Sequence, residues 1–446
     1  MKAKNSFFRT VCSIAIPVAL QSVLQSSFSV IDQIMVGQLG SVSVAGVGLA
    51  GKFASVYSVL VSAVGVVAGI MISQYIGQKN KREMHRSFWM NLWISLGIAI
   101  LFTVGCMGMS ERIMSLYSTD ADTIQAAADY LRIYAGTFVP VAATLIFSTL
   151  YRCLEKASIP LVASTAAAVL NTGMNYVLIF GKCGFAPMGV EGAAIASVLS
   201  QCIACVFLVI LLFHYKEKEQ SDWEAAQEPS RFNWSQYAAM LLPILTCELL
   251  WSLGENVYAI IYGHLGTIAC AAMTLTNPIQ GIMIGALCGM SQAASIIVGK
   301  MLGNEEYDQA YQAGKKIVWY TFFGALLMSV ILVLTAPLYV EIYQVEETTK
   351  VLTRQILIAY ALVAPFKVMN MTLGGGIIRS GGKTKYVMVI DIIGTWVFGV
   401  PLGLLSAFVW KLSIPYVYFI LSLEECVRFA ISLVVFKKRS WMQKLD

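Results

Sequence analysis

The stretch that decides the fold lies near the N-terminus, where residues 11–37 read VCSIAIPVALQSVLQSSFSVIDQIMVG. A helix needs ~20 consecutive apolar residues to cross the hydrocarbon core of a bilayer, and this run exceeds that length. Across all 446 residues, 58% are apolar and 13% are charged, whereas a soluble domain carries about 25% charged residues. This composition excludes a soluble enzyme, a disordered chain and a disulfide scaffold. We therefore expect an all-α integral membrane protein.

Eleven further apolar runs follow, separated by short polar segments, so the sequence predicts twelve transmembrane helices. The twelve predicted spans lie at residues 11–37, 44–76, 88–109, 130–151, 158–181, 190–214, 236–262, 268–299, 316–339, 355–378, 384–407 and 412–436.

Basic residues are concentrated in alternate connecting segments. If the N-terminus is cytoplasmic, 22 of the 31 Lys and Arg residues lie on the cytoplasmic side. The outer segments hold only Arg112, Arg132, Lys182, Lys350, Arg354 and Lys411. Because cytoplasmic loops are enriched in Lys and Arg, we expect both termini to be cytoplasmic, in an inner membrane of the bacterial type. The net charge of +6 therefore indicates membrane orientation and no nucleic-acid partner.

An internal repeat relates the two halves of the chain at an offset of 226 residues. It pairs Pro17 with Pro243 and Gly77 with Gly303, and it aligns MVGQLG (residues 35–40) with IYGHLG (residues 261–266). Six spans in each half give the halves the same orientation, which predicts a pseudo-two-fold axis along the membrane normal. We expect an N-terminal six-helix half at residues 1–215, a cytoplasmic linker at 216–235 and a C-terminal six-helix half at 236–446.

Polar stripes inside two spans are the first candidate functional sites. In the first span, Asp32 lies on one face with Gln21, Gln25 and Ser29. In the seventh span, Glu248 and Glu255 form a second stripe with the same period, and Asn171 and Asn175 lie one turn apart in the fifth. These carboxylates either serve only as hydrogen-bond partners between helices or bind a proton or a hard monovalent cation. Burial in lipid is costly, so we favour a functional role.

Other ionisable residues inside the spans have several interpretations. Lys367, in the tenth span, has two interpretations. It is either a counter-ion for Glu248, Glu255 or Asp391, or a charge that repels organic cations from part of a cavity. We favour ion pairing. Asp391 is equally consistent with helix packing and with function. Glu424 and Arg428 have the i, i+4 spacing of an ion pair.

Motifs for catalysis and for metal binding are missing from the sequence. GGIIRSGGKT (residues 375–384) ends like a phosphate-binding loop, but its first glycine is one position off and no strand precedes it. The histidines have no zinc-site spacing. Cys202 and Cys205 lie in an apolar run and are interpreted as small buried hydrophobic residues. We expect neither an enzyme nor a metal protein.

Motifs along the whole chain resemble the multidrug and toxic compound extrusion (MATE) family. The stretches in chain order are Ile16–Gly40, Ser73–Asn80, Leu170–Gly181, Met188–Ser197, Cys247–Thr267, Val298–Glu306 and Gly374–Tyr386. The fifth and the last of them resemble the DinF-like branch.

The resemblance implies that Asp32 is a proton or sodium site supported by Asn171. The family often has a second Asp where this chain has Asn175, and this departure favours protonation of Asp32 over a sodium ion there. The resemblance also implies a coupling Glu in the seventh helix, for which Glu248 and Glu255 are both candidates. Gln25, Ser29, Lys367 and Asp391 are candidates for the substrate cavity or for ion pairs.

We expect a cation-coupled antiporter, driven by protons in preference to sodium, that exports amphipathic and cationic organic compounds by alternating access. Its partners would be small organic substrates and the lipid bilayer, it would act as a monomer, and it would need no cofactor besides the coupling ion. The alternative is a flippase for a lipid-linked oligosaccharide or a cell-wall precursor. Such a substrate calls for a basic cavity, for which only Lys52 and Lys367 are candidates.

Overall fold

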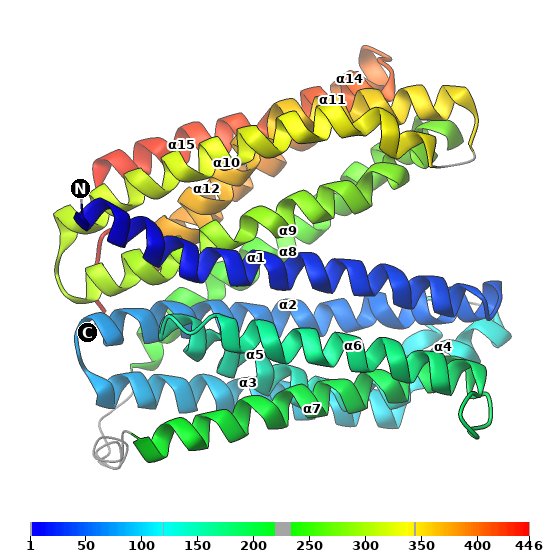
Figure 1. Ribbon diagram of the computed structural model, residues 1–446. Coiled ribbons are helices and arrows are strands. Elements are labelled where there is room, and N and C mark those ends of the chain that lie inside the picture. The colour runs from blue at the N-terminus through cyan, green and yellow to red at the C-terminus, as the bar shows by residue number, and fades with distance from the viewer. Residues whose placement is uncertain (1, 119, 219–232, 343–344, 446) are drawn as a thin grey trace. The chain divides into compact units, whose positions relative to one another are not determined.

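The computed structural model describes residues 2–118, 120–218, 233–342 and 345–445, and these residues form helices and no strands (Figure 1). The first half of the chain contains α1 (Lys2–Gly37), α2 (Ser41–Gly77), α3 (Lys81–Met114), α4 (Ala121–Tyr134), the 3-10 turn η1 (Ala135–Thr137), α5 (Phe138–Cys153), α6 (Ser158–Phe180) and α7 (Gly189–Lys218). Most of the predicted linker, residues 219–232, lies outside the described residues.

The second half contains α8 (Trp234–His264), α9 (Thr267–Gly303), α10 (Tyr307–Glu341) and α11 (Glu347–Asn370). It continues with η3 (Met371–Ile378), α12 (Lys385–Ile392), η4 (Ile393–Gly399), α13 (Val400–Leu404), η5 (Leu405–Val409), α14 (Ile414–Ser422) and α15 (Glu424–Lys438). The segments η3, η4 and η5 are π-helical. The predicted all-α class is therefore confirmed.

Eleven helices within the described residues are long and apolar enough to cross a membrane, and they correspond to the first eleven predicted spans. Several extend beyond the predicted ends because their first turns are capped by polar residues. Asn80, for example, accepts the backbone N–H of Glu83 at 3.1 Å and starts α3 seven residues before the predicted span. Asp120 caps α4 by accepting from the N–H and the hydroxyl of Thr123, and these bonds lower the pKa of Asp120.

The twelfth predicted span, residues 412–436, is divided into α14 and α15 at Leu423. The break comes just before the charged sequence that opens α15 with Glu424 and Glu425. Neither piece alone has the length of a membrane-spanning helix, so the predicted twelfth span is a broken helix and is not among the eleven long apolar helices of the described residues.

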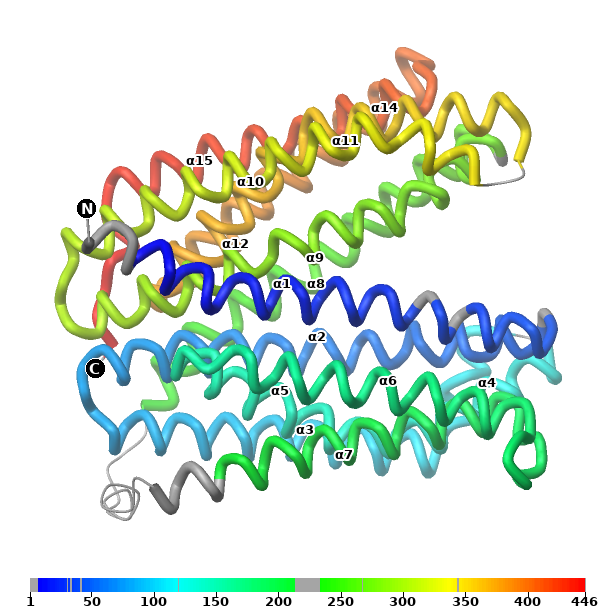
Figure 2. The backbone as a smooth tube through the Cα atoms, in the orientation of Figure 1, coloured from blue at the N-terminus to red at the C-terminus, as the bar shows by residue number. Residues whose placement is uncertain are grey.

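The helices form two compact units. One unit contains Val23–Ile72 and Asn80–Arg231, and the other contains Met1–Ser22, Ser73–Lys79 and Phe232–Asp446. Both α1 and α2 therefore pass from one unit into the other. Within the units, α6 lies beside α7 and α10 lies beside α11 (Figure 2).

Each unit has its own apolar core. In the first, Tyr57 stacks on Phe138 with ring centroids 4.2 Å apart and donates its hydroxyl to the Phe138 carbonyl at 2.6 Å. In the second, Tyr258, Ile261 and Leu421 belong to one buried cluster.

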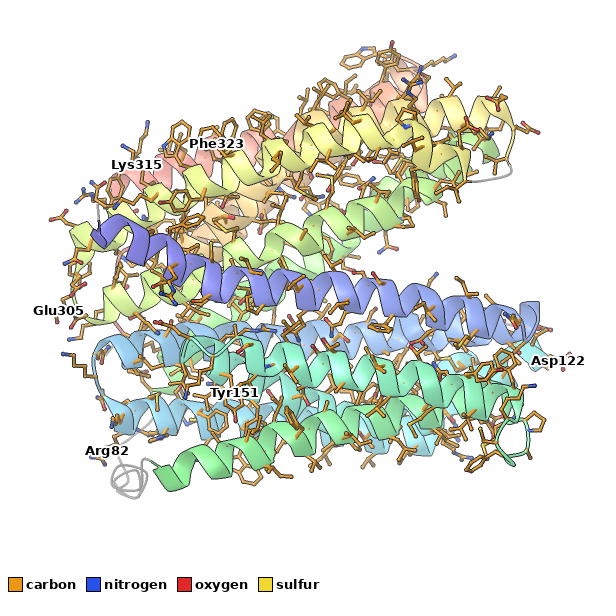
Figure 3. All side chains as sticks on the ribbon, viewed as in Figure 1. Arg82, Asp122, Tyr151, Glu305, Lys315 and Phe323 are labelled. Atoms are coloured by element: carbon orange, nitrogen blue, oxygen red, sulfur yellow. The ribbon has the colours of Figure 1, made fainter. Side chains whose placement is uncertain are left out.

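Large apolar side chains also cover the outside of the helices. Phe323 projects from α10 and is 60% exposed, and Leu338 on the same helix is 73% exposed (Figure 3). Cys202 and Cys205, interpreted from the sequence as small buried hydrophobic residues, are half-buried on α7. Exposed apolar surface of this extent suits contact with lipid.

The ends of α2 and α9 cross at two glycines that the sequence repeat pairs. A Cβ at Gly77 would overlap the carbonyl of Lys300, and a Cβ at Gly303 would overlap the carbonyl of Gln74. Gln74 and Lys300 are themselves separated by the repeat offset of 226 residues. The two helices thus approach with pseudo-two-fold symmetry, and each glycine accommodates the backbone of the other helix.

We expect Gly303→Ala to destabilise the protein by about 1–3 kcal/mol, because a helix backbone cannot move away from the new methyl group as a side chain can. Gly97→Ala in α3 is the matched control, since no atom lies within 4 Å of a Cβ there. Thermal unfolding of the purified variants in detergent measures both effects. Equal melting temperatures for the two variants would contradict the crossing.

Candidate functional site

Asp32 lies in the last turns of α1 and faces two asparagines of α6. Asn175 Nδ2 donates to Asp32 Oδ1 at 2.8 Å. Asn171, one turn earlier on α6, has a terminal amide atom 2.9 Å from Asp32 Oδ2. Because Asn171 and Asn175 are only 9% and 2% exposed, two buried amides hold the carboxyl group of Asp32.

A half-turn of the Asn171 amide exchanges its nitrogen and oxygen, and the hydrogen bonds favour the nitrogen toward Asp32. With its nitrogen toward Asp32, it donates to Oδ2 at 2.9 Å and its oxygen accepts from the Ser197 N–H at 3.2 Å. With its oxygen toward Asp32, that oxygen accepts from Asn175 Nδ2 at 3.2 Å, and the nitrogen donates to Ser197 Oγ at 3.3 Å. The first arrangement suits a carboxylate, which only accepts, and the second suits a carboxylic acid, whose O–H needs an acceptor.

Gln25 and Ser29 precede Asp32 on α1, and both are exposed. Within the described part of the chain, neither of them forms a hydrogen bond with Asp32. The polar stripe of α1 therefore contributes Asp32 to this site, while Gln25 and Ser29 stay candidates for a surface of the cavity.

Glu248 and Asp391 belong to one chain of polar contacts between α8, α12 and the end of η3. Arg379 Nη1 lies 3.7 Å from Glu248 Oε1. The thiol of Cys247 donates to Asp391 Oδ2 at 2.6 Å, and Arg379 Nη2 donates to Cys247 Sγ at 3.3 Å. Glu248 thus has a cationic partner, which distinguishes it from Asp32.

Arg428 on α15 is surrounded by three carboxylates. Its guanidinium lies 3.4 Å from Glu424, 3.8 Å from Glu425 and 3.8 Å from Asp391. The expected i, i+4 pair of Glu424 and Arg428 is therefore present, within a larger cluster. The side chains of Arg428, Glu424 and Glu425 are each 7% exposed, so these charges are stabilised by one another and not by water.

Lys367 on α11 pairs with Glu425, with Nζ and Oε1 3.9 Å apart. None of the three carboxylates expected for it from the sequence lies within ion-pair distance among the described residues. Asn370 Nδ2 also donates to Glu425 Oε2 at 3.2 Å, so α11 contributes two donors to the same carboxylate.

Two glycines of η4 provide the space for this cluster. A Cβ at Gly394 would overlap the side chain of Arg428, and a Cβ at Gly399 would overlap Glu424 and the hydroxyl of Tyr258. Tyr258 in turn donates to Glu424 Oε2 at 2.5 Å. The π-helical turns of the eleventh span therefore accommodate buried charges of α15, as π-helical turns often do at functional sites.

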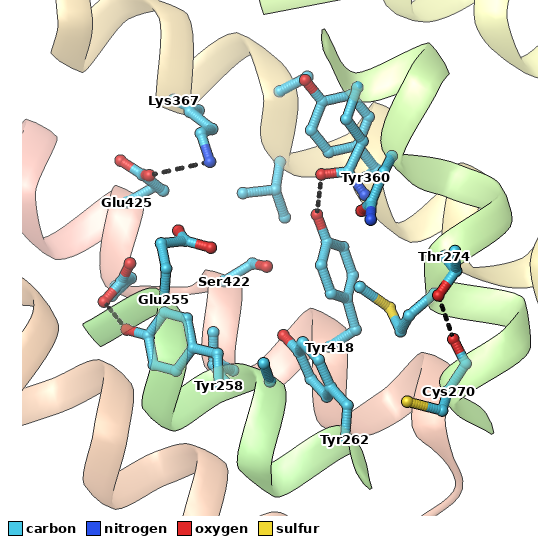
Figure 4. A pocket seen from close by; sticks show the side chains of 18 residues that line it. Glu255, Tyr258, Tyr262, Cys270, Thr274, Tyr360, Lys367, Tyr418, Ser422 and Glu425 are labelled. Carbon is cyan, nitrogen blue, oxygen red and sulfur yellow. Dashed lines mark hydrogen bonds and ion pairs between the residues drawn. The ribbon is translucent and has the colours of Figure 1, made fainter. Parts of the chain in front are cut away.

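A cavity of about 250 Å³ opens beside the cluster. Its walls include Glu255, Glu424, Glu425 and Lys367, together with the tyrosines Tyr258, Tyr262, Tyr360 and Tyr418 (Figure 4). Of the candidates from the sequence, Glu255 and Lys367 thus share this cavity, whereas Glu248 and Asp391 do not line it. Glu255 is exposed to it, and no described residue forms an ion pair with Glu255.

Sequence reasoning did not single out Glu425, Arg379 or the four tyrosines. Glu425 carried a weak signal, because it lies three residues before Arg428 on the same helix. Arg379 directly follows the tenth predicted span, and its pairing with Glu248 joins parts of the chain 131 residues apart. The tyrosines are distant in sequence, and only the fold gathers them around one cavity.

Comparison with known proteins supports the resemblance noted above. The family model described as MatE matches residues 17–177 and 243–405. "Probable multidrug resistance protein NorM" of Agrobacterium fabrum is 24% identical over 424 residues, which cover 92% of this chain and 88% of that protein. "Multidrug and toxin extrusion protein 1" of Homo sapiens is 25% identical over 427 residues, covering 93% and 72%.

Among solved structures, the bent form of the Vibrio cholerae MATE transporter VcmN has a TM-score of 0.87 to this chain. It is 17% identical, and the alignment covers 98% of each chain. At this identity the likeness supports the fold.

The helical fold and its buried polar sites define a multi-pass membrane transporter. Because the family model matches more than half of the chain, the protein belongs to the MatE family. Members of this family are transporters and not enzymes, as the sequence predicts. The DinF-like branch stays a prediction.

We expect Arg428→Gln to destabilise the protein by about 3–5 kcal/mol, because it leaves buried carboxylates without their shared cation. Glu424→Gln in the same chain removes one of those charges and should restore part of the loss. Thermal unfolding of the single and double variants in detergent measures the coupling. Strictly additive effects would contradict the cluster.

Proposed function

We propose that this protein is a cation-coupled antiporter that exports amphipathic, cationic organic compounds, with Asp32 as the proton-coupling residue. The proposal rests above all on the surroundings of Asp32. Two buried amides hold the carboxyl group, and no described cationic side chain pairs with it. If the Asn171 amide turns, it presents its oxygen to Asp32 in place of its nitrogen. The nitrogen donates to a carboxylate, and the oxygen accepts the O–H of a carboxylic acid.

The same surroundings favour a proton over sodium. A sodium site built on Asp32 would be formed from oxygen ligands. Asn171 and Asn175 offer neutral amide oxygens, so Asp32 is the one carboxylate in this set of contacts, which suits a single protonation. A sodium ion near Asp32 is the alternative, and the experiment below separates the two ions.

The substrate class is inferred from the charges of the cavity in the C-terminal part of the chain. Three glutamates and one lysine line it, so its walls attract cations and disfavour a pyrophosphate group. The names of the relatives, which refer to multidrug resistance and to toxin extrusion, agree with export of organic compounds. The acidic lining argues against the flippase alternative.

A proton gradient is sufficient for such export without ATP. One elementary charge crossing 100 mV releases ~2.3 kcal/mol, which corresponds to roughly a fiftyfold gradient of a neutral solute. A monovalent cation exchanged for one proton moves no net charge. In that case only the pH difference drives transport, and each pH unit supports about a tenfold gradient.

We further propose the organisation expected from the sequence. The halves at residues 1–215 and 236–446 would alternate access to the two sides, with the linker at 216–235 between them. The distribution of Lys and Arg supports cytoplasmic termini and an inner membrane of the bacterial type. We propose that one chain transports by itself.

The test is transport of ethidium by the purified protein in liposomes, first with an imposed pH gradient and then with a sodium gradient. We expect transport with the pH gradient, and we expect Asp32→Asn to abolish it because the amide cannot bind and release a proton. The matched control is Asp122→Asn, the same change at an exposed position in the first turn of α4, which should leave transport intact.

Other outcomes identify other mechanisms. Transport driven only by sodium would contradict proton coupling. Transport that survives Asp32→Asn would transfer the coupling role to Glu248 or Glu255. If neither gradient drives the transport of any organic cation, the antiporter proposal fails and the flippase alternative is tested next.

A further inference from the structure

The charges around the C-terminal cavity are unevenly paired. Glu424 pairs with Arg428, and Glu425 pairs with both Lys367 and Arg428. Glu255, the third glutamate of the lining, has no ion pair with any described residue and is exposed to the cavity. One lining carboxylate is therefore available to a ligand (Figure 4).

The walls also provide aromatic rings and an unused hydroxyl. Tyr262 and Tyr418 lie with their ring centroids 6.4 Å apart, and aromatic faces attract organic cations. The hydroxyl of Tyr360 is buried and has no hydrogen-bond partner among the described residues. A buried polar group of this kind is normally paired, so it indicates a ligand in the cavity.

We infer that this cavity selects organic compounds with a single positive charge and that Lys367 excludes compounds with two. The inference rests on the proposed export of organic cations and adds the charge of the substrate. The ammonium of Lys367 neutralises Glu425, so a bound ligand meets one unpaired carboxylate, Glu255. A compound with two positive charges would place its second charge near Lys367, which repels it.

Two substitutions change this balance in opposite directions. Lys367→Met keeps the length of the side chain and removes its charge. Glu425 then shares only Arg428 with Glu424 and Asp391, so the cavity wall gains negative charge that a second positive charge on a ligand can meet. Glu425→Gln releases the ammonium of Lys367 toward the cavity and should weaken the binding of every cation. Lys367→Arg keeps the charge and is the matched control.

The experiment compares N-methyl-4-phenylpyridinium, with one charge, and methyl viologen, which has two charges on a body of similar shape. Calorimetry measures the binding of both to the purified protein, and liposome transport is measured in parallel. We expect the unmodified protein and Lys367→Arg to prefer the single charge by about tenfold and Lys367→Met to lose this preference.

An unmodified protein that binds both probes equally, or an unchanged preference in Lys367→Met, would overturn the inference. Stronger cation binding by Glu425→Gln would also overturn it. If the binding pattern is as expected but neither probe is transported, the charge selection stands and the proposed export fails, so the two failures are distinguishable.

A second inference comes from the C-terminal tail, Arg439–Leu445, which is separate from the cavity. Arg439 has φ of 56°, and this turn directs the chain back against the helix ends. Trp441 is completely buried and Leu445 is 3% exposed. The tail is therefore packed as part of the fold.

The tail hydrogen-bonds to the end of α2. The N–H of Leu445 donates to Gln74 Oε1 at 2.8 Å, and Gln74 Nε2 donates to the Gln443 carbonyl at 3.2 Å. Gln78 Nε2 donates to the Leu445 carbonyl at 2.8 Å. Gln74 also lies at the crossing of α2 with α9, so the tail binds α2 where the two repeats meet.

The tail also binds two turns of the C-terminal half. Lys444 forms an ion pair with Glu305 at 2.6 Å, and Arg439 forms one with Asp308 at 2.6 Å. Lys383 donates to the Ser440 carbonyl at 3.0 Å. One short segment thereby connects the end of α2 with the α9–α10 turn and with the segment before α12.

We propose that this tail is a strap that holds the crossing of α2 and α9 closed and is released when the transporter opens at this end, which the charge distribution predicts to be cytoplasmic. Opening would separate Gly77 from Lys300 and Gly303 from Gln74. The tail contacts span both sides of that crossing, so they oppose the separation.

The test uses Ser73→Cys, which places a thiol at the crossing. Ser73 is completely buried and its side chain lies against Gly299 of α9. We expect a maleimide to label the introduced thiol about tenfold faster when residues 439–446 are deleted, because the closed population falls. Peptide mass spectrometry separates this thiol from the native cysteines. Unchanged labelling would overturn the proposal.

Ser95→Cys is the control for general unfolding, since Ser95 is equally buried, on α3. Its labelling should not change when the tail is deleted. If the labelling of Ser95→Cys rises, deletion of the tail has loosened the whole fold, and a milder change is needed. The full-length protein with Gln78→Ala and Lys444→Ala weakens the contacts of the strap and keeps the tail. In this double variant, the proposal requires faster labelling of Ser73→Cys and unchanged labelling of Ser95→Cys. No increase at Ser73→Cys would refute the proposal.

Discussion

The burial of Arg428 is the constraint on which the C-terminal part of this protein depends. A guanidinium in an apolar helical bundle is tolerated only if carboxylates pair with it and neighbouring groups complete their hydrogen bonds. Asp391 from α12 and Glu424 and Glu425 from α15 supply the charges. Lys367 and Asn370 connect the same cluster to α11.

The local backbone is adapted to this cluster. Gly394 and Gly399 belong to the π-helical segment η4, and both positions would overlap the charged cluster if they carried a Cβ. The irregular segment η4 of the eleventh span thus provides the space that the buried charged side chains of α15 need. Irregular helices at membrane depth are typical of transporters where they line a binding region.

The polar site around Asp32 is built on a different principle. Its partners are neutral amides, which can donate to a carboxylate and, after a half-turn, accept from an acid. The C-terminal cluster instead pairs its carboxylates with the cationic side chains of Arg428 and Lys367. This contrast is the physical reason for proposing that Asp32 exchanges the coupling ion and that the C-terminal cavity recognises the substrate.

The family resemblance led us to expect Asp32 beside Asn171. The amino-acid sequence by itself determined the class of protein, the membrane spans and the repeat. These features follow from composition, helical periodicity and a fixed offset, all of which are local or regular. The sequence did not reveal the pairing of Lys367 with Glu425, that of Arg379 with Glu248, or the cavity of tyrosines. Ion pairs between distant helices depend on helix rotation and on glycine-sized gaps, and only the tertiary structure decides these.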